Sequence, residues 1–258
     1  MKIGVSYNVF DGEELLEGSI LCIRPHVDFI SVVYQKKSNF GNDCDPELTN
    51  LLKSLQTKGL IDELFEYKPQ VNRGGHFNEV MKRNLGVFLS EGAKCTHHMS
   101  MDTDEYYDEE QFKFLCKTME EGDYDSSACQ LITYYKDSTY RLEPMEDYYV
   151  SLIYKLKRGK TFIAGQPFPV LVDPTRRMEP GNCKIFTREE LEMHHLSYVR
   201  KNIKTKLTNS SASPNFKSID KIADYFNNWK YGKQALMGGA PDKFYDIVKV
   251  EDKFKIKL

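Results

Sequence analysis

The chain has a single tryptophan among its 258 residues, and none of its six cysteines forms a Cys-x-x-Cys pair. Most of the cysteines lie in or beside apolar segments, which indicates free thiols in a reducing compartment rather than a disulfide framework. No uncharged apolar run approaches the roughly 20 residues that a membrane-spanning helix needs. The first residues have the pattern of a strand rather than of a signal peptide. These absences predict a cytoplasmic protein without a membrane span.

Neither sign of charge is in excess, because 36 Lys and Arg residues face 38 Asp and Glu residues, for a net charge of −2. A balance of this kind predicts no nucleic-acid partner held by bulk electrostatics. The sequence also contains neither G-x-x-x-x-G-K-[ST] nor G-x-G-x-x-G, which counts against a P-loop kinase, a GTPase and a Rossmann dehydrogenase. Hydrophobic residues make up 40% and aromatic residues 12% of the chain, which fits a well-packed globular core.

Strand-like and helix-like segments alternate through the first half of the chain. Strands are predicted at residues 2–6, 29–34 and 61–67 and in the run that ends at Asp102, with helices around residues 16–23, 46–58 and 77–88 between them. Asp11, with Glu14 three residues later, is predicted to cap the first helix. The alternation predicts an α/β fold with a mainly parallel sheet, helices on both faces, and ligands bound at the carboxyl ends of the strands.

The pattern changes from about residue 123. Strands are predicted at residues 128–135, 148–154 and 167–172, separated by loops rich in charge and proline. A capping-box pattern at residues 187–190 predicts a short helix, a further helix follows around residues 219–226, and residues 244–258 are expected to add an edge strand. We therefore expect an α+β elaboration of the same sheet.

Asp102 and Asp104 are the strongest chemical feature of the sequence. They follow residues 96–101, a run without acidic or strongly basic side chains, at the end of a predicted buried strand. Two carboxylates at this spacing form a hard-oxygen site for Mg²⁺ or Mn²⁺, which leaves positions free for phosphate oxygens. The alternative is a solvated helix start, where acidic residues are common. The preceding strand favours the metal site.

Two further groups of residues could bind a phosphate or a metal. Two adjacent histidines, His194 and His195, cannot both face one direction, so at most one is available as a ligand; a surface pair is the alternative. Lys82 and Arg83 lie on the helix that follows a Gly-Gly pair, where they could bind phosphate or form a solvated stripe. The sequence leaves both alternatives open.

Several segments, taken in order, resemble glycosyltransferases of the GT-A fold, and most of all the family-2-like enzymes. They are residues 7–14 (Tyr-Asn-Val-Phe-Asp-Gly-Glu-Glu), 32–42, 82–86 (Lys-Arg-Asn-Leu-Gly), 101–105 (Met-Asp-Thr-Asp-Glu) and 195–200 (His-Leu-Ser-Tyr-Val-Arg). The likeness covers roughly residues 1 to 205 and is specific as an ordered set. It implies a single GT-A domain over residues 1–258, with a nucleotide-sugar-binding half (1–122), an acceptor-side half (123–205) and a C-terminal helical extension (206–258).

The resemblance also implies the ligands and their residues. The donor would be a nucleotide-diphosphate sugar, with a UDP-sugar favoured, and the acceptor a hydroxyl of a glycan or glycoconjugate. Asp104 would hold Mn²⁺ or Mg²⁺ together with His195, and Asp102 would lie nearer the ribose and the sugar. The nucleotide pocket would be lined by Tyr7, Asn8, Tyr34 and Asn39, with Lys82 or Arg83 near the phosphates.

One part of the family pattern is missing. No carboxylate after the metal motif stands out as the base that an inverting transferase needs. The candidates are Glu143, Glu146 and Asp147, of which we predict Glu146, while a retaining mechanism stays open. The acceptor is expected over loops that carry Gln166, Arg176 and Arg177.

Two other functions remain to be weighed. A nucleotidyltransferase acting on sugar phosphates also uses paired carboxylates, but it normally has a Gly-rich basic loop after its first strand, where this chain has Asn-Val-Phe-Asp at residues 8–11. A non-catalytic domain that binds sugar nucleotides or carbohydrate is the second alternative.

Overall fold

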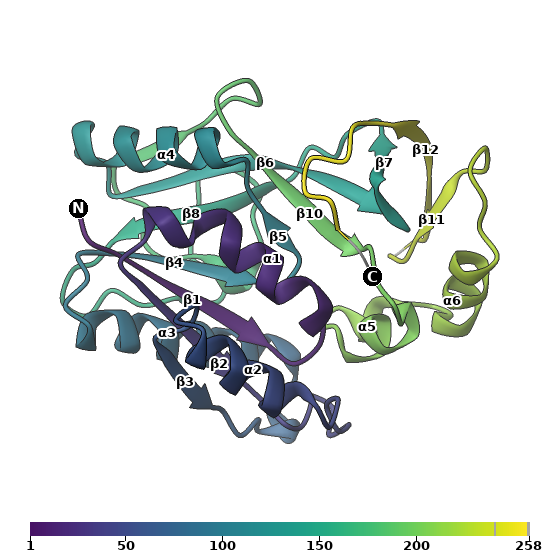
Figure 1. Cartoon of the computed structure of the whole chain (residues 1–258), viewed down its shortest axis with the longest axis horizontal. Coiled ribbons are helices and arrows are strands. Elements are labelled where there is room, and N and C mark those ends of the chain that lie inside the picture. Colours follow the sequence, from purple (N-terminus) through teal and green to yellow (C-terminus); the bar gives the residue numbers. More distant parts are fainter. Residues whose placement is uncertain (240, 257–258) are drawn as a thin grey trace.

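The computed structural model describes residues 1–239 and 241–256 and shows one large mixed sheet with helices packed on it (Figure 1). The strands are β1 (Ile3–Val9), β2 (Phe29–Tyr34), β3 (Glu63–Glu66), β4 (His97–Asp102), β5 (Glu105–Tyr106), β6 (Ser126–Tyr135), β7 (Asp137–Glu143), β8 (Tyr149–Lys155), β9 (Cys183–Ile185), β10 (Glu192–Tyr198), β11 (Ala235–Met237) and β12 (Lys243–Lys249). The α-helices are α1 (Glu13–Ile23), α2 (Leu48–Thr57), α3 (Gly75–Gly92), α4 (Glu109–Glu121), α5 (Ile203–Asn209) and α6 (Ile219–Asn227). The main path of the sheet runs β11-β12-β7-β6-β8-β4-β1-β2-β3.

Strands β4, β1, β2 and β3 are parallel neighbours, as the alternation in the sequence predicts. The register places Asn8 of β1 beside Asp102 of β4 and beside Val33 of β2. The carboxyl ends of these strands therefore meet at one edge of the sheet. This is the edge of the sheet at which the sequence predicts ligands to bind, and Asn8, Tyr34 and Asp102 all lie on it.

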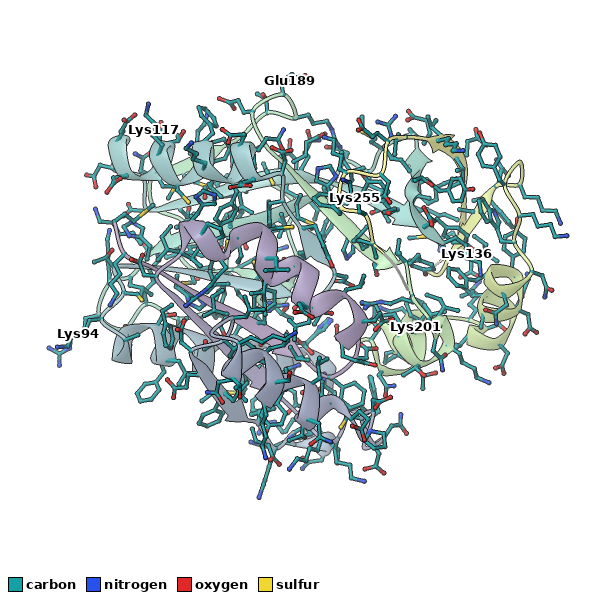
Figure 2. All side chains as sticks on the ribbon, in the orientation of Figure 1. Lys94, Lys117, Lys136, Glu189, Lys201 and Lys255 are labelled. Atoms are coloured by element: carbon teal, nitrogen blue, oxygen red, sulfur yellow. The ribbon has the colours of Figure 1, made fainter. Side chains whose placement is uncertain are left out.

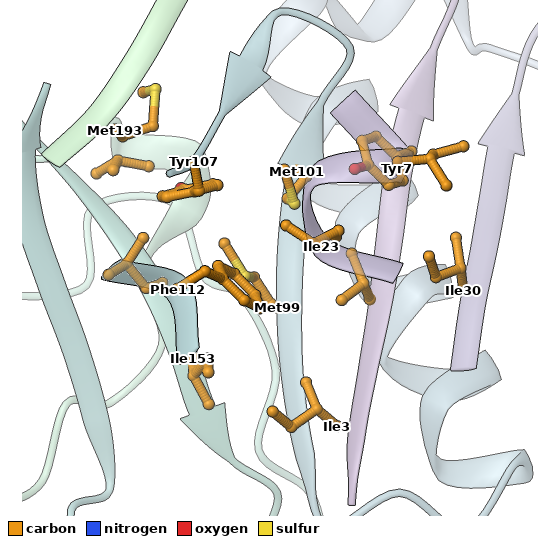
Figure 3. Close-up of a cluster of buried hydrophobic side chains, with 14 of the residues drawn as sticks. Ile3, Tyr7, Ile23, Ile30, Met99, Met101, Tyr107, Phe112, Ile153 and Met193 are labelled. Carbon is orange, nitrogen blue, oxygen red and sulfur yellow. The ribbon is translucent and has the colours of Figure 1, made fainter. Parts of the chain in front are cut away.

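The two faces of the parallel strands are covered by different helices. Helix α3 lies close against one face, where a Cβ on Gly86 would come within 2.4 Å of Ser6. On the opposite face, Tyr7 and Met101 belong to the main apolar core together with Ile23 of α1 and Phe112 of α4 (Figure 3). Since successive side chains of a strand point to opposite faces, Asn8 and Tyr7 serve different sides of the sheet.

The second half of the chain continues the same sheet with both antiparallel and parallel strand pairs. Strand β8 pairs with β4 and with β6, and β10 runs parallel to β6. The short strand β5, which directly follows the acidic motif, pairs with β10 and sets His195 opposite Glu105. This non-local pairing carries the histidine segment to the edge of the sheet where the parallel strands end.

Several predicted elements differ in the structure. Residues 167–172 form no strand, apart from an isolated bridge at Val172, whereas β7 was not predicted. At residues 187–190 the backbone N–H of Thr187 donates to the Glu190 carboxylate at 2.8 Å, as in a capping box, but the chain completes one turn and enters β10 instead of a helix. The expected helical extension also contains β11 and β12. Strand β12 has neighbours on both sides, so the prediction of an edge strand is wrong; residues 257 and 258 lie outside the described part.

Figure 2 shows Lys94 and Lys117 on the other side of the molecule from Lys201. Within residues 1–239 and 241–256, no helix combines the length and the apolar character that crossing a membrane requires.

Candidate active site

A cavity of about 300 Å³ opens at the carboxyl ends of β1, β2 and β4. Seven of the residues predicted for the site line it, although they come from distant parts of the sequence: Asn8, Asn39, Lys82, Arg83, Asp102, Asp104 and His195. The cavity is closed on the other side by α5 and the residues after it. The predicted location of the site is therefore also where the structure has a cavity.

Three predicted residues do not line the cavity. Tyr7 points to the opposite face of β1, where its hydroxyl lies 3.0 Å from Ser19 Oγ and burial raises its pKa well above the ordinary value. Tyr34 belongs to the same apolar core as Tyr7. The Glu146 carboxylate accepts a hydrogen bond from Thr133, which lies beside His195 in the neighbouring strand, so Glu146 is next to the cavity but outside its lining.

Asp104 is 2% exposed, and its charge is compensated by two cations that the sequence analysis did not assign. Its Oδ2 accepts hydrogen bonds from Arg200 Nη2 at 2.6 Å and from Lys206 Nζ at 3.0 Å. Burial raises the pKa of Asp104, but the nearby Lys206 and Arg200 outweigh burial and hold the pKa below its ordinary range. Asp104 is therefore ionised at neutral pH.

The other oxygen of Asp104 faces the predicted histidine. His195 Nε2 lies 3.8 Å from Asp104 Oδ1, and burial lowers the pKa of His195 despite that carboxylate, which favours the neutral, ligating imidazole. The adjacent His194 points to the other face of β10, where Nδ1 lies 2.8 Å from the Tyr134 hydroxyl. The prediction that only one of the two histidines can face the site is confirmed.

Asp104 and His195 fit a divalent cation that arrives with phosphate. Two ligand atoms that each bind an Mg²⁺ ion at about 2.1 Å can be at most about 4.2 Å apart, and the observed 3.8 Å is within this limit. In the described part of the chain, no cluster of three or more His, Cys, Asp or Glu side chains could hold a metal by itself. Mg²⁺ is commonly held by one or two carboxylates plus substrate phosphates, so this donor set suits a metal shared with a diphosphate.

Asp102 is held by two arginines below the cavity. Arg176 Nη2 lies 2.8 Å from Asp102 Oδ2 and also contacts the Glu105 carboxylate, and Arg83 Nη2 lies 3.4 Å from Asp102. Burial raises the pKa of Asp102, but Arg176 and Arg83 bring it below the ordinary range. Burial raises the pKa of Glu105 to about 7, in spite of Arg176. Arg176 was expected on an acceptor loop, but at 3% exposure it is a buried counter-charge instead.

Lys82 and Arg83 serve different parts of the cavity, although they are adjacent on α3. Lys82 Nζ lies 2.9 Å from Glu79 Oε1, which also accepts a hydrogen bond from Asn39 at 3.0 Å, so Lys82 faces the loop after β2. Arg83 instead donates to Ser100 Oγ at 2.7 Å and lies beside Asp102. Both side chains are buried, and the solvated-stripe interpretation of this pair is therefore wrong.

Asn8 presents an amide to the cavity. It is 7% exposed, and neither its Oδ1 nor its Nδ2 has a hydrogen-bond partner among the residues that the structure describes. Leaving a buried polar group unpaired costs about 1–3 kcal/mol, so such a pair of atoms indicates that a ligand or water completes the site. The contact between Asn8 and a nucleotide stays a prediction.

Gly12 makes room for Arg200 to reach Asp104. Its φ is +76°, and a Cβ at this position would lie 2.0 Å from Arg200 Nη1. The same left-handed residue precedes α1, which has no side-chain cap, so the prediction that Asp11 caps this helix is wrong. Glycine is needed here for two independent reasons: its backbone conformation and the close approach of a guanidinium group.

Charged residues of the site that were not predicted include Glu105, Asp173, Arg200 and Lys206. Arg200 follows β10, the strand that bears His195, and this strand was not predicted. Lys206 is 102 residues from its partner Asp104, a separation at which no local pattern indicates a contact.

Comparisons with known proteins give only distant structural similarities. No protein-family model and no curated protein matches the chain. Among solved structures, S. aureus TarS 1–349 in complex with UDP-GlcNAc aligns with a TM-score of 0.48 and 13% identity over 88% of this chain and 72% of that chain. TarS 1–349 without a stated ligand gives 0.46 and 13% over 81% of this chain and 66% of that one, and the longer TarS chain gives 0.46 and 12% over 81% and 40%. The chain is thus shorter than these neighbours, and a similarity this low leaves the function to be argued from the site.

Proposed function

We propose that the chain is a metal-dependent glycosyltransferase of the GT-A fold, which moves a sugar from a nucleotide-diphosphate donor, with a UDP-sugar favoured, to a glycan hydroxyl. The observation that carries the proposal is the meeting of Asp102, Asp104 and His195 in one cavity at the carboxyl ends of parallel strands. Ligands of open α/β sheets bind at this edge. The ordered resemblance of the sequence to family-2-like enzymes supports the same function.

The charges around the cavity suit a diphosphate. Arg200 and Lys206 lie on one oxygen of Asp104 and are placed to contact phosphate oxygens as well, since each cation can donate several hydrogen bonds. A divalent cation held by Asp104 and His195 would neutralise the charge that develops on the leaving diphosphate. Arg83 and Arg176 keep Asp102 ionised and oriented on the side where the sugar would lie. Asn8 would bind the nucleoside.

The metal ion and the nucleotide should each strengthen the binding of the other. Arg200 and Lys206 repel a bare cation at Asp104, whereas a diphosphate compensates both charges. We expect Mn²⁺ alone to raise the melting temperature little, UDP alone to raise it moderately, and the two together to raise it by more than the sum of the separate shifts. Differential scanning fluorimetry with UDP, GDP and Mn²⁺ measures these shifts.

A matched pair of variants makes the binding experiment specific. Asp104→Asn keeps the shape of the side chain but removes its charge, so we expect the joint shift to disappear. Asp108→Asn alters an aspartate that caps α4 outside the cavity, and we expect it to keep the shift. An unchanged shift in Asp104→Asn, or no shift with any nucleotide in the wild type, would contradict the proposal.

The two rival functions give different results. A nucleotidyltransferase releases pyrophosphate from a nucleoside triphosphate and a sugar phosphate, whereas the proposed enzyme releases a nucleoside diphosphate from a sugar nucleotide. A binding domain would show the thermal shift but release neither product.

A further inference from the structure

Of the five carboxylates that line the cavity, three are engaged by cations. Asp102 and Asp104 are held by arginines and by Lys206, and Glu79 is held by Lys82. Asp11 lies on the side of Arg200, whose pKa it helps to raise. Asp173, between β8 and β9, is the remaining carboxylate, and its side chain is 40% exposed.

The two oxygens of Asp173 have different surroundings. Oδ1 accepts hydrogen bonds from the backbone N–H of Thr175 at 2.7 Å and from the hydroxyl of Thr175 at 2.8 Å, which fixes the side chain at the start of a 3₁₀ turn (Pro174–Arg176). Oδ2 accepts no hydrogen bond from any described residue, and the nearest cation, Arg83 Nη2, lies 4.0 Å away. One oxygen therefore positions the carboxylate, and the other is left as a free proton acceptor.

Asp173 also lies on the side of the cavity where a sugar would react. The same Arg83 Nη2 that lies 4.0 Å from Asp173 is 3.4 Å from both carboxylate oxygens of Asp102. Asp173 and Asp102 therefore have Arg83 as a common neighbour, whereas Asp104 is paired with Arg200 and Lys206. Since Asp102 is assigned to the sugar and Asp104 to the metal and the diphosphate, Asp173 belongs to the sugar side, where an acceptor hydroxyl attacks if the configuration at the anomeric carbon is inverted.

We propose that Asp173 is the general base of the transfer, an inference that rests on the proposed function. Asp173 Oδ2 takes the proton of the acceptor hydroxyl, and the hydroxyl oxygen uses its electron pair to form the bond to the anomeric carbon. The bond from that carbon to the phosphate oxygen breaks, and its electron pair leaves with the nucleoside diphosphate. The reaction needs no further reactant and gives a product with inverted configuration.

Glu146, the base predicted from the sequence, has a different environment. Its carboxylate is hydrogen-bonded to Thr133 and lies outside the cavity lining, beside the strand of His195. Burial and the nearby charge of Asp173 raise the pKa of Tyr148 to about 12, so its phenol keeps its proton at neutral pH.

The test uses Asp173→Asn, because an asparagine Oδ1 can still accept the hydrogen bonds that fix the turn, whereas its Nδ2 cannot take a proton. Asp137→Asn is the matched control: Asp137 Oδ1 accepts the same two bonds from Thr139, at 2.9 Å from N–H and 2.7 Å from the hydroxyl, in an exposed hairpin away from the cavity. UDP-glucose, UDP-galactose, UDP-N-acetylglucosamine and GDP-mannose are supplied with Mn²⁺, with water as the acceptor. Released nucleoside diphosphate and the first-formed anomer of the free sugar are measured.

We expect Asp173→Asn to lower kcat by about 10²–10⁴-fold, the usual contribution of a general base, with the KM for the donor and the joint UDP–Mn²⁺ thermal shift unchanged. Asp137→Asn should keep the wild-type kcat, and the first-formed sugar should be the inverted anomer. Wild-type kcat in Asp173→Asn, a retained anomer, or a loss of kcat in Glu146→Gln but not in Asp173→Asn would overturn the assignment. If the wild type turns over no donor, the result contradicts the proposed function and not the assignment of Asp173 as its base.

Discussion

At the scale of single residues, the site is a set of buried charges that are compensated in pairs. Arg176 neutralises Asp102 and Glu105, while Arg200 and Lys206 neutralise Asp104. Such pairs are costly to desolvate, and removing one partner of a buried pair is more costly than removing both. The arrangement keeps both motif carboxylates ionised without a metal ion.

Arg176→Met should therefore destabilise the protein strongly, because it leaves the buried Glu105 without its counter-charge and leaves Asp102 with Arg83 alone. We expect the free energy of unfolding to fall by about 3–5 kcal/mol, measured by urea denaturation. Arg24→Met is the control, since it removes a partly exposed pair with Asp62 and should cost about 0–1 kcal/mol. Equal losses in the two variants would contradict this role of Arg176.

His98 predicts a dependence of stability on pH. Burial lowers the pKa of His98 to about 3, whereas an unfolded histidine titrates near 6.5. Below pH 6.5 the unfolded chain binds a proton that the folded chain does not, so stability falls as the pH falls. His98 alone should contribute about 2 kcal/mol of this loss between pH 6.5 and pH 5. Thermal unfolding across this range should show a shallower dependence in His98→Asn than in the exposed-site control His76→Asn; equal slopes would contradict the interpretation.

Site residues could be predicted from the sequence where they lie at the end of a recognisable strand. Asp102, Asp104 and Asn8 could be placed because each lies at the end of a recognisable strand. The alternation of side chains along β1 also explains why the prediction that Tyr7 lines the pocket is wrong. Tyr7 is adjacent to Asn8 and therefore points to the other face of the sheet. Arg200, Lys206 and Asp173 reach the cavity only through tertiary packing, which no local pattern specifies.

At the scale of secondary-structure elements, the turn between β1 and α1 links the fold to the site. Gly12 directly precedes α1 and has a positive φ, and its missing side chain leaves the space that Arg200 occupies. The turn between β1 and α1 thereby determines where the guanidinium group of Arg200 lies, although Arg200 is nearly 200 residues away in the sequence.

Gly12→Ala should affect both stability and ligand binding. The backbone strain costs about 1 kcal/mol, and displacing Arg200 from Asp104 adds to it. Gly59→Ala provides a matched comparison, because Gly59 has a φ of +74° but open space around its Cβ position. We expect Gly12→Ala to lose more stability than Gly59→Ala and to weaken the UDP–Mn²⁺ thermal shift, which Gly59→Ala should retain. Similar effects of the two substitutions would argue against a specific role for the space beside Arg200.

The strands of the first half were predictable as elements, and parts of the second half were not. Strands β1 and β2 are uncharged, and β4 has no acidic or strongly basic residue before Asp102; nearly all residues of the three strands are buried, as expected for strands covered on both faces. Strand β7 contains Asp137, Arg141 and Glu143 and lacks this pattern, so it was missed. Residues 167–172 have the composition of a strand, yet their prolines at 167 and 169 remove backbone donors that a sheet requires.

At the scale of the whole molecule, the cavity is formed jointly by the two halves of the chain. The parallel strands and α3 contribute Asn8, Lys82, Asp102 and Asp104, and the later segments contribute Asp173, His195 and Lys206. The α/β class and the edge of the sheet followed from the alternation in the sequence. The pairing of β10 with β5 and β6, which carries His195 to the motif, did not, because pairing of distant strands depends on the assembled core.

The central claim is that this cavity transfers a sugar from a nucleotide-diphosphate donor with the help of a divalent cation. Its most direct test is the release of nucleoside diphosphate from a set of UDP- and GDP-sugars in the presence of Mn²⁺, with and without EDTA. We predict that the wild type turns over at least one donor, that EDTA abolishes the release, and that Asp104→Asn lowers kcat by about 10²–10³-fold. No release from any donor, or a release that neither EDTA nor Asp104→Asn reduces, would contradict the claim.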